Sequence, residues 1–145
     1  MFFIFLAIWI TDSFVFHYTT FLREVVPNFI RVPLAAIILI IGWILAKGGM
    51  KAVFGTPREK PEVIDTGVFQ VIRHPIYTGA LLFYLGAICT TLSIVSLIFW
   101  LGILICYILI ARYEEKILTE EFGEEYIHYK KQTGMLFPRL FGKSD

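Results

Sequence analysis

The stretch Arg73-His74-Pro75-Ile76-Tyr77-Thr78-Gly79 lies where a polar connector meets a long apolar run. Taken singly, its residues are typical of a membrane boundary: an arginine that snorkels, a polar histidine and a proline in the first turn of a helix. Together they bring a guanidinium, an imidazole and a phenol to the edge of hydrocarbon, where ionisable groups are costly. This combination, followed by a small residue, predicts a functional site at the start of a helix.

The composition is that of an integral membrane protein. The chain has 145 residues, of which 57% are hydrophobic and 17% are charged, and its mean hydropathy is +0.72. These values are too apolar for a soluble domain of this size. The net charge of +1 argues against a nucleic-acid partner, which would require a basic surface. The cysteines and histidines show neither a disulfide framework nor the spacing of a metal site.

The apolar segments predict an all-α, polytopic membrane protein with four transmembrane helices. About 20 apolar residues span a hydrocarbon core. The third and fourth segments are joined by a tight turn at residues 90–93, so they form a predicted helical hairpin, and Gly48-Gly49 resembles the end of a helix. The predicted spans are Phe2 to Phe21, Phe29 to Gly49, Ile76 to Thr91 and Leu92 to Ala111.

The polar segments lie between and after these spans. A connector runs from Met50 to about Thr66, and Gly67 is expected to start a turn before a short interfacial helix. After Ala111, apolar and aromatic residues recur at helical spacing, which predicts an amphipathic helix that continues the fourth span and bends at Gly123. The segment from Leu136 to Leu140 is expected to dock back onto the protein.

We therefore expect a single membrane domain over residues 1–145. It consists of two helices (1–50), a connector with the motif (51–75), the hairpin (76–111) and a C-terminal helix with a tail (112–145). Five lysines and arginines lie in residues 47–73, six lie from residue 112 onward, and the remaining turns hold two. The positive-inside rule then places connector, tail and both termini in the cytoplasm. Without a retention or transit signal, a prokaryotic plasma membrane is expected.

Two acidic residues of the C-terminal helix stand apart from the rest. Residues 112–131 hold six of the twelve acids of the chain, and most of them are expected to be solvated. Glu114 and Glu115 lie within about a turn of the membrane exit, so they can face the segment 73–77. A carboxylate there can pair with Arg73 or bind a cationic or hydroxyl-bearing ligand.

These motifs, in this order, resemble the isoprenylcysteine carboxyl methyltransferase family and its phospholipid methyltransferase relatives. The resemblance is strongest between about Pro61 and Pro138. Its elements are Gly67-Val68-Phe69, the stretch 73–79, Glu114-Glu115-Lys116-Ile117-Leu118 and Phe122-Gly123-Glu124-Glu125-Tyr126-Ile127-His128-Tyr129.

The resemblance implies a membrane methyltransferase that takes S-adenosylmethionine from the cytosol and a lipophilic or lipid acceptor from the bilayer. It implies that Arg73 orients the cofactor carboxylate or the acceptor and that Glu114 braces Arg73, so these two are the catalytic candidates. The implied cofactor-binding residues are His74, Tyr77, Gly79 and Glu115. The Gly-rich nucleotide motif of soluble enzymes is absent from the sequence.

The acceptor remains open between a carboxylate and an amine. A carboxylate is already nucleophilic at neutral pH and needs only orientation, for example by a bidentate contact from Arg73. An amine needs a base such as Glu114, Glu115 or His74 to keep it neutral. Whether oxygen, nitrogen or sulfur is methylated does not follow from these residues.

Three other functions also fit parts of the sequence. Four short helices with Asp12 in the first describe a small proton-coupled multidrug transporter, but that function leaves the stretch 73–79 and the acidic tail unexplained. A related membrane reductase would bind a nicotinamide cofactor in a similar pocket. A catalytically silent scaffold is the third alternative.

Overall fold

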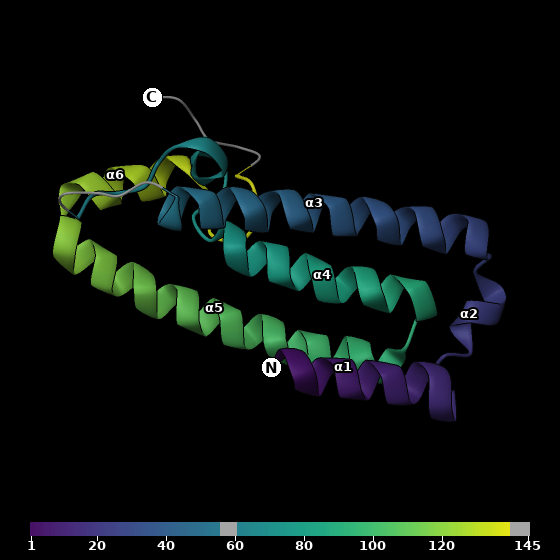
Figure 1. Ribbon diagram of the computed structural model, residues 1–145. Coiled ribbons are helices and arrows are strands. Elements are labelled where there is room, and N and C mark those ends of the chain that lie inside the picture. Colours follow the sequence, from purple (N-terminus) through teal and green to yellow (C-terminus); the bar gives the residue numbers. More distant parts are fainter. Residues whose placement is uncertain (56–60, 140–145) are drawn as a thin grey trace. The chain divides into compact units, whose positions relative to one another are not determined.

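The computed structural model describes residues 1–55 and 61–139. These residues form helices and loops, with one isolated β-bridge (Figure 1). The all-α prediction is confirmed. Two helices, α3 and α5, are long and apolar enough to cross a membrane, and the segments Phe2–Phe16 and Pro75–Thr91 are shorter apolar helices. The helical elements are α1 (Phe2–Ile10), a π-helical turn (Thr11–Phe16), α2 (Leu22–Val25), α3 (Asn28–Phe54), a 3₁₀ turn (Gly67–Gln70), α4 (Pro75–Thr91), α5 (Ile94–Phe122) and α6 (Glu124–Gln132).

The chain divides into two compact units. Unit 1 contains residues 1–43 and 80–106, and unit 2 contains residues 44–79 and those from 107 onward. Helices α3, α4 and α5 each supply residues to both units. The predicted functional stretch and both tail glutamates belong to unit 2.

In unit 1 the first apolar helix is shorter than predicted. It ends at Phe16 rather than Phe21, and His17 adopts a left-handed backbone with φ of 54°. The Asp12 carboxylate causes this ending, because it accepts hydrogen bonds from the Thr19 backbone nitrogen (3.1 Å) and the Thr19 hydroxyl (2.6 Å). The short helix α2 lies between this loop and α3.

The contacts of Asp12 are those of a structural residue. Its side chain is buried, and a third hydrogen bond comes from the Ser93 hydroxyl at 2.6 Å. Because Thr19 and Ser93 lie on separate segments, the carboxylate ties the first loop to the start of α5. A buried carboxylate with three donors is well satisfied, so this geometry gives no support to transport through Asp12.

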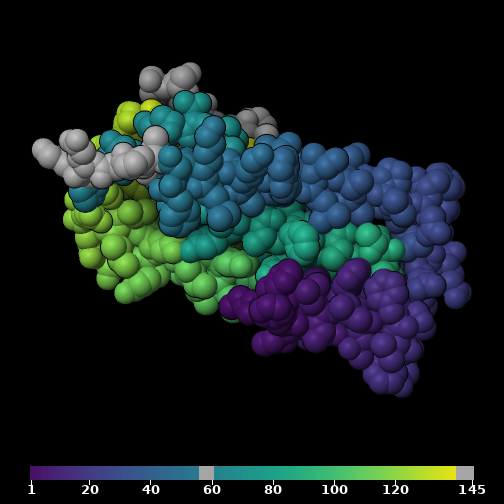
Figure 2. All heavy atoms as spheres, viewed as in Figure 1, coloured from purple at the N-terminus to yellow at the C-terminus, as the bar shows by residue number. Residues whose placement is uncertain are grey.

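The predicted hairpin of α4 and α5 is present in unit 1. Leu92 turns the chain with a φ of 54°, and the Trp100 indole nitrogen donates to the Leu81 carbonyl at 2.9 Å across the pair. Helix α1 lies against α4 (Figure 2). The ring centroids of Phe5 and Tyr84 are 4.6 Å apart in this contact. The hairpin therefore forms the framework of this unit.

In unit 2 the helix α3 continues past its predicted end at Gly49 to Phe54, so the connector begins later than residue 51. Gly48 and Gly49 are packing residues and not a helix cap. A Cβ on Gly48 would lie 2.8 Å from Val68, and one on Gly49 would lie 2.8 Å from Ile76. The absence of side chains lets α3 approach the loop and α4. The connector residues 56–60 lie outside the described part.

The C-terminal part of unit 2 follows the prediction closely. Helix α5 runs without a break to Phe122, and the chain turns at Gly123, whose φ is 55°, into α6 (Figure 1). A loop after α6 then returns to the segment before α4, where Ile72 and Gly134 form a parallel bridge. Leu136 is buried there, while the predicted docking residue Leu140 lies outside the described residues.

Candidate functional site

Backbone pairing with the C-terminal loop holds the motif in place. The Arg73 backbone nitrogen donates to the Gly134 carbonyl at 2.8 Å, and the His74 nitrogen donates to the Met135 carbonyl at 3.1 Å. Pro75 then starts α4. In the first turn of that helix the Thr78 hydroxyl donates to the Leu136 carbonyl at 2.8 Å. Two segments far apart in sequence thus orient the first side chains of the site.

Arg73 and Glu115 form a buried ion pair. Nε of Arg73 lies 2.7 Å from Oε1 of Glu115, and the two side chains are 9% and 7% exposed. Nη1 of Arg73 donates to the carbonyls of Lys130 and Thr133. The prediction that Glu114 braces Arg73 is wrong, since the adjacent residue Glu115 takes this position.

Glu115 is surrounded by basic side chains. Nζ of Lys130 lies 3.0 Å from Oε2, and Nε2 of His74 lies 3.5 Å from Oε1. Burial alone would raise the pKa of Glu115, which lies beyond the apolar part of α5. The His74 imidazole and the hydrogen bonds from Arg73 and Lys130 outweigh burial and lower this pKa to about 2. Glu115 therefore stays ionised as the anchor of the cluster.

Glu114 faces a different set of partners. The Tyr77 hydroxyl donates a short hydrogen bond to Oε1 of Glu114, and Nδ1 of His74 lies 3.5 Å from Oε2. The His74 and Tyr77 rings stack with centroids 5.5 Å apart and an interplanar angle of 2°. The Glu114 side chain is 40% exposed. Of the two glutamates, it is the one that solvent and ligand can reach.

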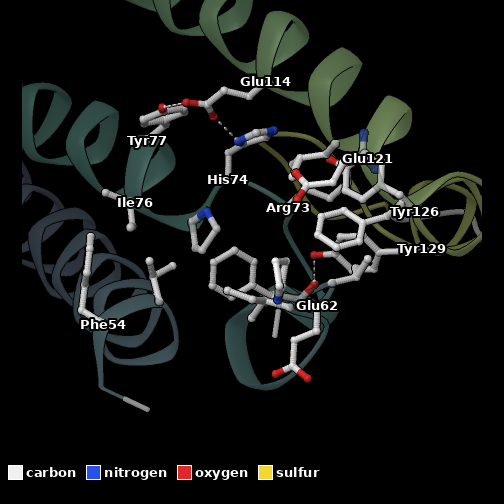
Figure 3. A pocket seen from close by; sticks show the side chains of 18 residues that line it. Phe54, Glu62, Arg73, His74, Ile76, Tyr77, Glu114, Glu121, Tyr126 and Tyr129 are labelled. Atoms are coloured by element: carbon white, nitrogen blue, oxygen red, sulfur yellow. Dashed lines mark hydrogen bonds and ion pairs between the residues drawn. The ribbon is translucent and has the colours of Figure 1, made fainter. Parts of the chain in front are cut away.

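These side chains border a cavity of about 780 Å³ in unit 2 (Figure 3). Of the six predicted site residues, Arg73, His74, Tyr77 and Glu114 line it, whereas Gly79 and Glu115 do not. Gly79 is buried in the second turn of α4. The full lining is Val53, Phe54, Pro61, Glu62, Val63, Ile64, Phe69, Arg73, His74, Pro75, Ile76, Tyr77, Glu114, Leu118, Glu121, Phe122, Tyr126 and Tyr129.

The aromatic wall of the cavity was not predicted as part of the site. Phe122, Tyr126 and Tyr129 were expected on the apolar face of an amphipathic helix and as part of the family motif at residues 122–129, but they were not among the predicted site residues. The Tyr129 hydroxyl donates to the Phe69 carbonyl at 2.7 Å, and burial raises the pKa of Tyr129 to about 12. Its proton is therefore retained, and the hydrogen bond fixes the ring.

The donor set does not favour a metal ion. Within residues 1–55 and 61–139, no three His, Cys, Asp or Glu side chains lie close enough together to hold one. Glu114 of the cavity instead contacts Tyr77 and His74, and Glu115, which does not line the cavity, pairs with Arg73. Hydrogen bonds and ion pairs therefore organise these two glutamates.

Residues 30–125 match the family model described as phospholipid methyltransferase (PEMT), which covers the motif, the hairpin and both glutamates. The chain belongs to the phospholipid methyltransferase family. The predicted family resemblance is thereby confirmed. The match ends just before Tyr126, so two aromatic residues of the cavity wall lie beyond it.

Curated relatives of this PEMT-family chain carry several names. Methanethiol S-methyltransferase of Pseudomonas deceptionensis is 36% identical over 73 residues, 50% of this chain and 27% of that protein. Protein-S-isoprenylcysteine O-methyltransferase of Saccharomyces cerevisiae is 35% identical over 85 residues, 57% of this chain and 36% of that protein. The cobalt-zinc-cadmium resistance protein CzcN of Cupriavidus metallidurans is 30% identical over 90 residues, 61% of this chain and 41% of that protein.

The chain thus covers well under half of the length of these relatives. No solved structure matches the chain. Family membership consequently rests on the family model, and the acceptor must be argued from the cavity.

Proposed function

We propose that this chain is an integral membrane methyltransferase that uses S-adenosylmethionine to methylate a small lipophilic acceptor. The observation that carries the proposal is the cavity of unit 2, in which Arg73, His74, Tyr77 and Glu114 of the family motifs share one lining with an aromatic wall. Membership of the phospholipid methyltransferase family supports the same reaction.

The lining fits a cationic cofactor with a planar base. Three carboxylates, those of Glu62, Glu114 and Glu121, border the cavity. Phenyl and phenol rings from the connector, α4 and the α5–α6 region border it as well. Aromatic faces and carboxylates both attract a sulfonium or ammonium cation, while rings also stack on an adenine. Arg73 supplies the cation that a cofactor carboxylate needs.

Each motif residue then has a role that its contacts allow. S-adenosylmethionine supplies an electrophilic methyl group on a sulfonium. Arg73 is held by Glu115 through Nε and by carbonyls through Nη1, so its guanidinium is oriented before a ligand carboxylate arrives. His74 and Tyr77 present stacked rings to the cavity, and Glu115 acts through Arg73 as a positioning residue.

Glu114 is the proposed base for any acceptor that must lose a proton. Its carboxylate is half-exposed and already accepts a hydrogen bond from Tyr77, so it lies where an acceptor in the cavity can reach it. A thiol has a pKa near 8.5 and needs such a base at neutral pH, whereas a carboxylate does not. The names of the relatives include both a thiol and an isoprenylcysteine acceptor.

The membrane setting completes the proposal. We propose that all four apolar helices cross the membrane, including the shorter Phe2–Phe16 and Pro75–Thr91, with the cavity of unit 2 reached from the cytoplasm. The lysines and arginines of residues 47–73 and of the tail support this orientation. The expected location is a prokaryotic plasma membrane.

The first test is isothermal titration of the detergent-purified protein with S-adenosylhomocysteine. We expect saturable binding that His74→Ala weakens by about tenfold or more, because the variant removes a stacked ring and a cavity wall. Tyr107→Phe is the matched control, since Tyr107 stacks on Tyr77 without lining the cavity, and it should bind as the native protein does.

A titration with NADPH and two turnover assays separate the alternatives. A folded sample that fails to bind S-adenosylhomocysteine would contradict the proposed function, and binding of NADPH in its place would favour a reductase. Turnover with a small thiol and with a lipophilic carboxylate then identifies the acceptor. Glu114→Gln is expected to lower kcat by about 10²-fold or more with the thiol and to leave turnover of the carboxylate nearly unchanged.

A further inference from the structure

Unit 1 contains a second cavity, of about 560 Å³, which shares no lining residue with the cavity of unit 2. It lies among the segment after the first helix, the start of α3 and the end of α4. Two arginines are in its lining, against one glutamate. The lining residues are Phe14, Arg23, Glu24, Pro27, Asn28, Arg31, Thr90 and Thr91.

Arg31 is the central residue of this cavity. It is only 7% exposed, although it lies in the first turn of α3, just before a long apolar stretch of that helix. Nη1 donates to the Thr90 carbonyl at 2.5 Å, and Nη2 donates to the side-chain oxygen of Asn28. Nε is buried and has no hydrogen-bond partner among the described residues. The described residues therefore leave one donor of this buried guanidinium without a partner.

The positive charge of Arg31 is only partly compensated. Both of its acceptors are neutral, and within the described residues no carboxylate lies within ion-pair distance of Arg31 or of Arg23. The carbonyl end of α4 offers only a partial negative charge. Burying a cation without a full counter-charge is costly, so this cavity favours an anion.

The surroundings of the cavity indicate a lipid as the source of that anion. Around Arg23 and Arg31 the chain exposes large apolar side chains, which suit acyl chains better than water. Basic residues at the ends of apolar helices are a common binding arrangement for anionic headgroups. The exposed apolar residues are Phe14, Val15, Phe16, Tyr18, Phe21, Leu22, Val25, Phe29 and Ile30.

We infer that this cavity binds the phosphate of an anionic phospholipid. The guanidinium of Arg31 supplies a positive charge to the phosphate, and Arg23, which is exposed on the short helix α2, adds a second positive charge. Arg31 also joins α3 to the end of α4 through Thr90, so a bound headgroup stabilises the junction of these helices. This site is independent of the proposed methyl transfer.

The test compares thermal unfolding of the purified protein in detergent micelles doped with phosphatidylglycerol or phosphatidylcholine. We expect phosphatidylglycerol to raise Tm saturably and phosphatidylcholine to have little effect. Arg31→Gln should weaken the apparent phosphatidylglycerol affinity by about tenfold, because a charge-assisted contact is lost, and Arg23→Gln should weaken it less. Arg112→Gln, the same charge change at an exposed residue of unit 2, is the matched control.

The outcomes decide between the anion sources. An equal rise in Tm with glycerol 1-phosphate alone would overturn the lipid assignment in favour of a soluble anion. The same phosphatidylglycerol response in Arg31→Gln, Arg23→Gln and the native protein would overturn the site itself. If Arg31→Gln does not fold, Arg31→Lys replaces it. Arg31→Lys keeps the positive charge but loses the planar guanidinium. The rise in Tm with phosphatidylglycerol should therefore still be smaller in Arg31→Lys than in Arg112→Gln.

Discussion

At the scale of single residues, Glu115 organises the motif. One carboxylate receives Arg73, Lys130 and the nearby His74, so three basic residues from two segments meet at one anion. Removing one partner from a buried charged group usually costs more than the contact itself contributes, because the other charge is left unpaired. The shape of the loop before α4 thus depends on a residue that does not line the cavity.

Acid should therefore weaken the fold through Glu115. Its pKa of about 2 lies below the ordinary value of 4.5, so its ionised form stabilises the folded state at every pH above about 4.5. This stabilisation is lost as the pH falls from about 4.5 toward 2, and it amounts to something on the order of 3 kcal/mol. Thermal unfolding in detergent between pH 6 and pH 3 measures the effect.

The substitution Glu115→Gln provides the check on that pH profile. The variant should be less stable at pH 6 and should lose much of the decline in Tm between pH 5 and pH 3. Glu120→Gln is the control, because Glu120 is exposed and, among the residues that the structure describes, pairs only with Lys116 at 3.8 Å. An unchanged acid profile in Glu115→Gln would show that other groups govern acid stability.

The sequence predicted which residues meet but not which of two neighbours plays which role. Glu114 and Glu115 are adjacent, so they point about 100° apart around the helix. Which of them faces Arg73 depends on the rotation of α5 about its axis, and the packing of the whole unit sets that rotation. The role of the aromatic wall was not predictable for the same reason. An apolar helix face predicts that its residues are buried, but it does not predict that they line a cavity.

At the scale of elements, the loop after α6 is the part that fixes the motif. Its Gly134 accepts from the Arg73 backbone nitrogen and donates to the Val71 carbonyl at 3.3 Å. The chain then turns so tightly that a Cβ on Gly134 would lie 1.7 Å from the Phe137 carbonyl oxygen. Since the obstructing atom belongs to the backbone, an added side chain cannot be accommodated by a rotamer change.

Gly134→Ala should consequently open this turn. We expect a loss of about 1–3 kcal/mol of stability together with weaker binding of S-adenosylhomocysteine, because the backbone of Arg73 and His74 loses its partner. Thermal unfolding and titration calorimetry measure the two effects. Gly102→Ala is the control: nothing lies within 4 Å of its added Cβ, and a mid-helix alanine should be neutral or slightly stabilising. Equal stability of both variants would contradict the proposed role of the turn.

Helix boundaries were predictable where local signals act alone. Pro75 opens α4 one residue before the predicted start, and Gly123 bends the chain where expected. The predicted helix ends were wrong where tertiary contacts determine them. The first helix ends early because Asp12 binds Thr19. Helix α3 continues past Gly48 and Gly49 because Val68 and Ile76 pack against these glycines. These partners are distant in sequence or depend on side-chain geometry, so periodicity gives no sign of them.

At the scale of the whole molecule, the surface is that of a membrane protein. Many large apolar side chains are exposed along α1, α3 and the apolar part of α5, among them Phe3, Ile37, Trp43, Ile98 and Leu109. A soluble protein rarely exposes apolar side chains in such number. The amino-acid composition was enough to predict this exposed apolar surface, because the surface depends on the overall share of apolar residues and not on any particular contact.

The orientation of the chain in the membrane can be tested by cysteine labelling. In a background with Cys89→Ser and Cys106→Ser, single cysteines replace Leu22 in α2 and Lys131 in α6, both of which are exposed. The positive-inside rule places the tail in the cytoplasm and the turn near Arg23 on the other side. A membrane-impermeant maleimide should therefore label Leu22→Cys in intact spheroplasts and Lys131→Cys only in inverted vesicles. Labelling of both positions from the same side would contradict the four-span topology. It would also contradict the proposal that a cytosolic cofactor reaches a site built from residues 73–77 and Glu114.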